Sequence, residues 1–131
     1  MTSPAQDIAS YLAGLSGLDL SIATNLFVSE MPEDPDFVTS IYDSGAEFGD
    51  PRYDYQIPRI QIRFRGPRGD YRTMYSLALD VQNTLDGKSN VEINGSRYIG
   101  IWLITGFQFL SYDSLRRPLA TMNFRIQRTT L

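Results

Sequence analysis

The clearest local signal in the chain is a strand, a tight turn and a helix that follow one another between residues 58 and 87. In the strand, Ile60, Ile62 and Phe64 alternate with polar residues, which is the period of a half-buried strand. The turn contains Gly66, Pro67 and Gly69, residue types that interrupt regular structure. Helical spacing then appears in a second set of side chains: Tyr71, Met74, Ala78, Val81 and Leu85.

Capping residues mark the ends of this helix and the start of another. Asp70 is suited to the N-cap position, and Gly87 to the left-handed conformation that ends many helices. Ser3 and Gln6 form a capping box at the start of residues 3–15, where apolar residues also recur at helical spacing. The sequence therefore predicts two helices.

The other regular patterns are short strands separated by turns. Segments 25–30 and 37–42 predict a hairpin with a longer loop, and Asn94-Gly95 is typical of a two-residue hairpin turn. Further strands are expected at residues 97–112 and 119–127, with a turn at 113–118. The prediction is an α+β fold, a single domain over residues 1–131 with about two helices packed on one face of a largely antiparallel sheet.

Residues 43–57 have the weakest regular pattern. Two glycines, a proline and several acidic residues predict a long exposed loop that carries Phe48, Tyr53 and Tyr55. Exposed aromatic side chains on such a loop suit contacts with another subunit. The alternative is that these rings fold back onto their own domain.

The strand expected at residues 97–104 is apolar on both faces. Strict alternation places Ile99, Ile101 and Leu103 on one face. It places Tyr98, Trp102 and Ile104 on the other. Such a strand is either covered on both faces within its own domain or buried by a partner chain.

The charges divide the chain into two unlike halves. Residues 1–56 hold ten acidic side chains and one basic one, whereas residues 57–131 hold five acidic and eleven basic side chains. The two halves either neutralise each other within one domain or form an acidic and a basic surface suited to head-to-tail assembly. In the second case, we expect carboxylates of the first half to meet arginines of the second across a subunit boundary.

The residues offer little for catalysis. The chain has no histidine and no cysteine, so the commonest general base and the commonest transition-metal ligands are missing. Gly87-Lys88-Ser89 follows a helix, whereas a phosphate-binding loop precedes one. Two prolines interrupt the acidic segment 30–36, which predicts a solvated turn rather than a calcium site. We expect no enzymatic activity, no cofactor, no metal and no membrane span.

Arginines form the one charged cluster that such a chain could use for recognition. Arg59, Arg63 and Arg65 lie on one side of the central strand, and Arg68 and Arg72 follow it. A solvated sheet face, pairing with the acidic half and a nucleic-acid-binding face are the three alternatives. The sequence pI of about 4.8 argues against tight binding of duplex DNA.

Four segments together resemble a known protein family. They are, in chain order, NLFVSEMPEDPD, PRIQIRFRG, RYIGIWLITGFQFLSYD and RRPLATMNFRIQR. Their order and spacing are similar to those of the small bacteriophage proteins called minor capsid or tail terminator proteins, over nearly the whole chain.

The resemblance implies a structural role in a virion. Such a protein forms a ring, usually a hexamer, at the head-proximal end of a phage tail, after assembly in the host cytoplasm. Its partners are the tail tube protein and a head-completion or neck protein, and DNA passes through its channel without sequence-specific binding. A neck or head-completion ring and a nucleic-acid-binding module are the alternatives. The candidate subunit-interface or channel-lining residues are Arg59, Arg63, Arg65, Arg68, Arg72, Phe48, Tyr53, Tyr55 and Trp102.

Overall fold

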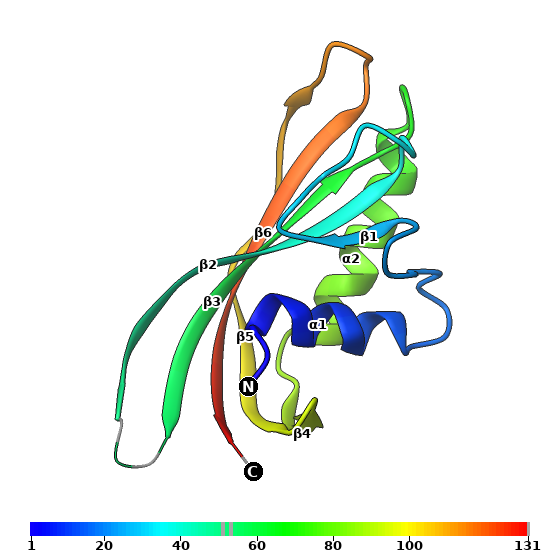
Figure 1. The fold of residues 1–131 in the computed structure, drawn as a ribbon. Helices are drawn as coiled ribbons and strands as arrows, with labels where there is room; N and C mark the ends of the chain where they lie inside the picture. Colours follow the sequence, from blue (N-terminus) through cyan, green and yellow to red (C-terminus); the bar gives the residue numbers. More distant parts are fainter. Residues whose placement is uncertain (51, 53, 131) are drawn as a thin grey trace.

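One curled sheet with two helices on the same side makes up the fold (Figure 1). The computed structural model describes residues 1–50, 52 and 54–130. The elements are α1 (Pro4–Ala13), β1 (Leu26–Val28), β2 (Val38–Asp50), β3 (Tyr55–Arg65), α2 (Tyr71–Leu85), β4 (Ser89–Ile93), β5 (Ser96–Tyr112) and β6 (Pro118–Thr130). The α+β prediction is confirmed.

The sheet has the strand order β1-β2-β3-β6-β5-β4. Every neighbouring pair is antiparallel except β1 and β2, which are parallel. The hairpin predicted from segments 25–30 and 37–42 is therefore wrong. Residues 29–37 carry the chain back along the sheet before β2 begins, so that both strands run in the same direction.

Both helices begin as their sequences predict. The side chain of Ser3 accepts a hydrogen bond from the Gln6 backbone, and the capping box is complete. Asp70 accepts from the Thr73 backbone at 3.1 Å, and Gly87 has a φ of 81°. Neither helix of the described chain is long and apolar enough to span a membrane.

The core lies between the helices and the sheet face that they cover. The buried residues of α2 are Met74, Ala78, Val81 and Leu85, four of the five residues in the predicted stripe. Ile60, Ile62 and Phe64 of β3 are fully buried beneath the helices, in one cluster with β6 residues Met122, Phe124 and Ile126.

A buried polar cluster joins the two ends of the chain beside this core. Asp7 of α1 is fully buried, and its carboxylate lies 3.0 Å from the Arg128 guanidinium of β6. The Tyr98 hydroxyl donates to the same carboxylate at 2.5 Å, and Asn94 donates to its other oxygen at 3.0 Å. Burial, together with this bond to Asp7, raises the pKa of Tyr98 above its ordinary value.

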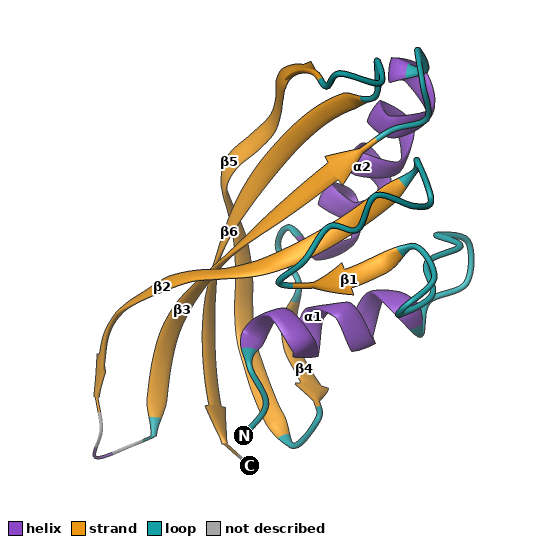
Figure 2. Cartoon of the chain, turned by 45° about the horizontal axis from the view of Figure 1, so that its top comes forward, coloured by secondary structure: helices purple, strands orange, loops and turns teal. Residues whose placement is uncertain are grey.

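The long strand β5 curls because it holds more residues than the β6 stretch that it pairs with (Figure 2). The pairing register shifts at four places along β5. The first shift lies between Tyr98 and Gly100, so Tyr98 and Ile101 are both buried whereas Ile99 and Trp102 are each 40% exposed. The predicted assignment of faces is therefore wrong, because the alternation was carried through this bulge.

The predicted loop at residues 43–57 is mostly strand. β2 continues to Asp50 and β3 begins at Tyr55, and the two form a hairpin arm that extends away from the helices (Figure 1). We call the part of β2 and β3 within residues 43–57 the arm. Within the described residues no helix covers the arm, so neither of its faces needs the apolar alternation that reveals a half-buried strand.

Candidate functional site

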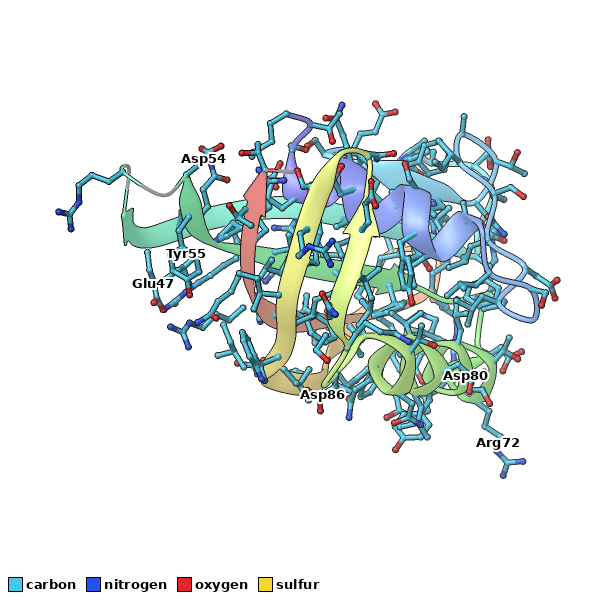
Figure 3. The ribbon with its side chains drawn as sticks, turned by 90° about the horizontal axis from the view of Figure 1, so that it is seen from below. Glu47, Asp54, Tyr55, Arg72, Asp80 and Asp86 are labelled. Atoms are coloured by element: carbon cyan, nitrogen blue, oxygen red, sulfur yellow. The ribbon has the colours of Figure 1, made fainter. Side chains whose placement is uncertain are left out.

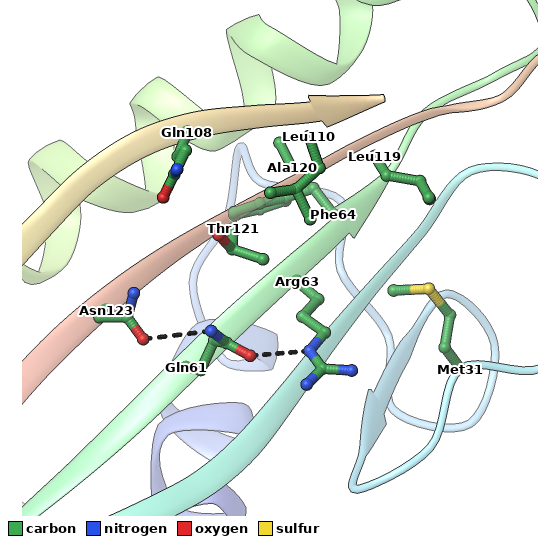
Figure 4. Close-up of a pocket in the computed structure, with 10 residues that line it drawn as sticks. All are labelled: Met31, Gln61, Arg63, Phe64, Gln108, Leu110, Leu119, Ala120, Thr121 and Asn123. Atoms are coloured by element: carbon green, nitrogen blue, oxygen red, sulfur yellow. Dashed lines mark hydrogen bonds between the residues drawn. The ribbon is translucent and has the colours of Figure 1, made fainter. Parts of the chain in front are cut away.

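The sheet face opposite the helices is the surface on which the predicted arginines lie. We call it the outer face. In the described part of the chain no helix covers it, and a groove of about 440 Å³ runs across β3, β6 and β5 (Figure 4). Arg63 donates to Gln61 at 2.8 Å, and Gln61 donates to Asn123 at 3.3 Å across the floor of the groove. The Arg63 guanidinium also lies 4.2 Å from the centre of the Tyr42 ring.

Arg65 has a different surrounding from its neighbours on β3. It is only 4% exposed, and its guanidinium donates to the main-chain carbonyls of Pro35 at 2.8 Å and Asp36 at 3.0 Å. The carbonyls of Pro32 and Glu33 accept from it as well. Burial, followed by repulsion from the nearby Arg117, lowers the pKa of Arg65 below its ordinary value. Arg65 therefore holds the acidic segment in place.

Arg117, the residue that precedes β6, binds the same acidic segment from the other side. It is 3% exposed, and its guanidinium lies 2.8 Å from Asp113 and 3.2 Å from Glu33. Burial alone would lower the pKa of Arg117, but its hydrogen bonds to these two carboxylates raise it. Arg68 also pairs with this segment, at 3.2 Å from Asp36. Glu33, Asp34 and Pro35 of this segment are exposed, as a solvated turn requires, and two buried guanidinium groups also bind it from beneath.

Arg59 pairs with the arm. Its guanidinium lies 2.5 Å from Glu47, and Arg125 of β6 binds the other oxygen of that carboxylate at 3.1 Å. The hydrogen bond from Arg59 is the main reason that the pKa of Glu47 lies below its ordinary value. Arg125 pairs directly with Arg59 on β3 and with Trp102 on β5, so the three side chains form a row across the outer face. Sequence patterns did not single out Arg125.

The other predicted residues are scattered. Arg72 is exposed on α2 and points away from the sheet (Figure 3). Tyr55 is half-buried on the arm, near Glu47 (Figure 3). The Phe48 side chain and all of Tyr53 lie outside the described residues. The structure therefore does not bring the nine predicted residues together into one site.

An exposed aromatic cluster, which the sequence pattern did not predict, lies between α2 and β5. Tyr71 and Tyr75 stack with 6.0 Å between ring centres, and the Phe107 ring meets the Tyr75 ring edge-on at 5.0 Å. Phe109 contacts both Tyr71 and Tyr112, each at 5.4 Å. We call these five residues the aromatic cluster. The four-residue spacing of Tyr71 and Tyr75 puts both rings on one face of the helix, and this spacing is the sequence feature that could have predicted part of the cluster.

Within the described residues no group of three or more carboxylates lies close enough together to hold a metal ion. What the surface offers instead is exposed apolar area: Trp102, Ile104, Phe109, Leu110 and Tyr112 of β5 are each at least 39% exposed. Uncovered apolar area of this kind is typical of a protein–protein contact surface.

Comparisons with known proteins agree with this description. The family model for the bacteriophage tail terminator protein matches residues 10–130. Among solved structures, one chain in the virion of a native gene transfer agent particle superposes with a TM-score of 0.70 at 14% identity. The superposition covers 97% of this chain and 95% of that chain, and at such identity it shows a shared fold. No curated protein matches the chain.

Proposed function

Because the chain belongs to the bacteriophage tail terminator family, we propose that it forms a ring that caps the head-proximal end of a phage tail tube. The ring stops polymerisation of the tube and joins the tail to the head. The match of the family model confirms the resemblance seen in the sequence, and the chain is a structural protein of a phage tail.

The exposed apolar stretch of β5 is the observation that carries the proposal. Residues 104–112 contain no charged side chain, and most of them are exposed. A monomeric domain gains nothing from leaving such a strand uncovered, because it invites pairing with other chains. A protein that functions only in an assembly needs such a surface. We propose six copies per ring, with the tail tube protein and a head-completion protein on its two sides.

Tail length is the measurement that tests the proposal. Without the protein, we expect tubes of irregular and excessive length, and addition of the wild-type chain restores one length in electron micrographs. The Ile104→Asp variant places a charge in the uncovered stretch and should fail to restore it. Lys88→Gln, a change outside that stretch, should restore it fully. Uniform tail length in the absence of the protein would contradict the proposal.

A neck ring is the competing role within the virion, and the location of the bound protein separates the two. We expect labelled protein at the ends of isolated, headless tails. Labelling of heads alone would favour a neck or head-completion protein. We propose that assembly takes place in the host cytoplasm. Tails without heads can therefore be recovered from cell lysates and examined.

The arginines decide whether the outer face lines the DNA channel. Arg59 and Arg68 pair with carboxylates and Arg65 binds main-chain carbonyls, whereas Arg63 is exposed and contacts the uncharged side chains of Gln61 and Tyr42. If Arg63→Glu spares assembly but impairs DNA ejection, the outer face lines the channel. If the variant abolishes assembly, Arg63 belongs to a subunit contact. Salt-dependent DNA binding that Arg63→Glu removes would instead favour a nucleic-acid-binding module.

A further inference from the structure

The sheet has two open edges, one on each side. β1 pairs with β2 only as far as Ile41, so residues 42–50 of β2 have no strand on that side within the described chain. β4 pairs with β5 only as far as Gly100. Beyond that residue, backbone and side-chain groups of residues 86–88 form hydrogen bonds with the β5 backbone as far as Leu103. Residues 104–112 of β5 therefore have no described strand beside them on the side away from β6.

The two open stretches are equal in length and lie at opposite corners of the sheet. Along the sheet, the arm is next to the end of β6, whereas residues 104–112 pair with the start of β6. In Figure 1 the arm accordingly lies at the lower left, and the β5–β6 turn at the top. Two such corners cannot meet within one chain, but they can meet between two copies.

The direction of the strands also fits. β5 runs antiparallel to β2 within a sheet, because three antiparallel pairings separate them. A second copy placed beside the first in the same orientation therefore brings its β2 antiparallel to β5. Contacts between two different surfaces of identical subunits generate a closed ring when the rotation closes.

The side chains on the two stretches do not oppose pairing. Residues 104–112 are uncharged, so no like charges meet. In the other stretch, the carboxylates of Asp43 and Glu47 already have partners in their own chain, the Ala5 backbone N–H for Asp43 and the guanidinium groups of Arg59 and Arg125 for Glu47. The aromatic cluster adds apolar area beside the β5 stretch.

We propose that residues 42–50 of one copy pair, as an antiparallel strand, with residues 104–112 of the next copy. The six-stranded sheet of each subunit then continues into its neighbour, and a ring of copies contains one uninterrupted sheet. Addition of a strand to an open sheet edge is a recurring mode of protein recognition. This inference rests on the proposed ring and names the contact that holds it together.

Disulfide trapping tests the contact, since the native chain contains no cysteine. We combine Ala46→Cys in β2 with Thr105→Cys, Gln108→Cys or Ser111→Cys in β5, and oxidise rings or capped tails. One combination should convert most chains into covalent oligomers larger than dimers on non-reducing gels. The matched control is Ala46→Cys with Asn83→Cys, an exposed position on α2, which should leave chains unlinked.

The direction of pairing gives a second readout. If the β2 cysteine moves from Ala46 to Ser44, towards the N-terminus, the best β5 partner should move towards the C-terminus. A shift in the other direction would mean parallel pairing and would overturn the proposed contact. In the unmodified protein, amide hydrogen exchange should slow in residues 42–50 and 104–112 together on assembly, which avoids any effect of substitution on folding.

The outcomes separate the contact from the function. Capped tails with no cross-link in any combination, and no slowing of exchange at the two stretches, would overturn the contact and leave the capping role intact. Failure of the unmodified protein to bind tail ends or form any oligomer would overturn both. Slowed exchange in residues 104–112 alone would mean that another protein covers β5, and would overturn the pairing of two copies.

Discussion

Arg65 shows how one side chain on an open face can be structural. Arg63 and Arg59 on the same strand are exposed, whereas Arg65 is buried under the carbonyls of residues 32–36. A planar guanidinium with several donors is suited to such a set of acceptors, since each N–H can reach a different carbonyl. The arginine pattern on β3 therefore combines a fixed anchor with exposed charges.

Replacement of Arg65 by methionine should destabilise the fold by about 2–3 kcal/mol, because the carbonyls that it binds lose a charged donor. Arg63→Met changes the same residue type on the same strand and face, and we expect its effect to stay within about 0.5 kcal/mol. Urea unfolding followed by circular dichroism measures both. Equal effects of the two substitutions would contradict the anchoring role.

At the scale of single elements, the arm depends on a carboxylate with two guanidinium partners. Glu47 on β2 accepts from Arg59 on β3 and Arg125 on β6, so one residue connects three strands. Among the described residues no helix covers the arm, and a short β structure without cover is marginal in water. The ion pairs therefore add to the backbone pairing of β2 with β3 and of β3 with β6 at this end of the sheet.

Acid should loosen the arm before the rest of the fold. The pKa of Glu47 in the folded state lies below its ordinary value of 4.5, so its contribution is complete above pH 4.5 and is lost as the pH falls through the folded value. Amide chemical shifts of residues 43–47 and 55–59 should change together in an NMR titration below that pH. Glu47→Gln should abolish this step, and the matched change Glu92→Gln on β4 should leave it. A step that persists in Glu47→Gln would assign it to another group.

The elements that could be predicted are those whose signals are local. The helix after Asp70 and the hairpin at Asn94-Gly95 depend on residues within a few positions of each other, and both are confirmed. The parallel pairing of β1 and β2 depends on distant arginines that hold the returning segment, a contact that no local pattern contains. The bulge after Tyr98 likewise appears only when β5 pairs with β6.

The candidate site was predictable only in part for the same reason. The alternation in its strand predicted that Arg63 lies on the polar side, and Arg63 is exposed on the outer face. The aromatic cluster was not predicted, because its members come from α2 and from β5, which meet only in the folded chain. Arg125 was not predicted as a candidate residue, because its neighbours Arg59 and Trp102 lie on two other strands.

For the whole molecule, the acidic and basic halves neutralise each other internally. Glu33, Asp36, Glu47 and Asp7 of the first half all pair with arginines of the second half in the same chain. The structure therefore supports the first explanation for the charge asymmetry, which is neutralisation within one domain. At least four of the ten carboxylates of the first half are therefore already paired within the chain, which weakens the hypothesis that they meet arginines across a subunit boundary.

Assembly should accordingly depend little on salt. Between about 0.1 M and about 1 M salt the screening length falls roughly threefold, which weakens contacts between exposed charges. Backbone pairing and apolar contacts are affected much less, so light scattering should report the same particle mass at both concentrations. The Ile104→Asp variant provides the comparison, since it should lower the mass at either salt concentration. Dissociation of the wild-type particle at high salt would show that charges hold it together.

The position of β6 sets an order of events during synthesis. β6 lies between β3 and β5, yet the ribosome makes it after both. Until β6 emerges, the β2–β3 hairpin and the β4–β5 hairpin share no strand, and the Asp7 carboxylate lacks the Arg128 guanidinium. A nascent chain therefore cannot present both sheet edges in one rigid frame. If the proposed strand pairing holds the ring together, only chains translated through β6 can join it, and unfinished subunits stay out.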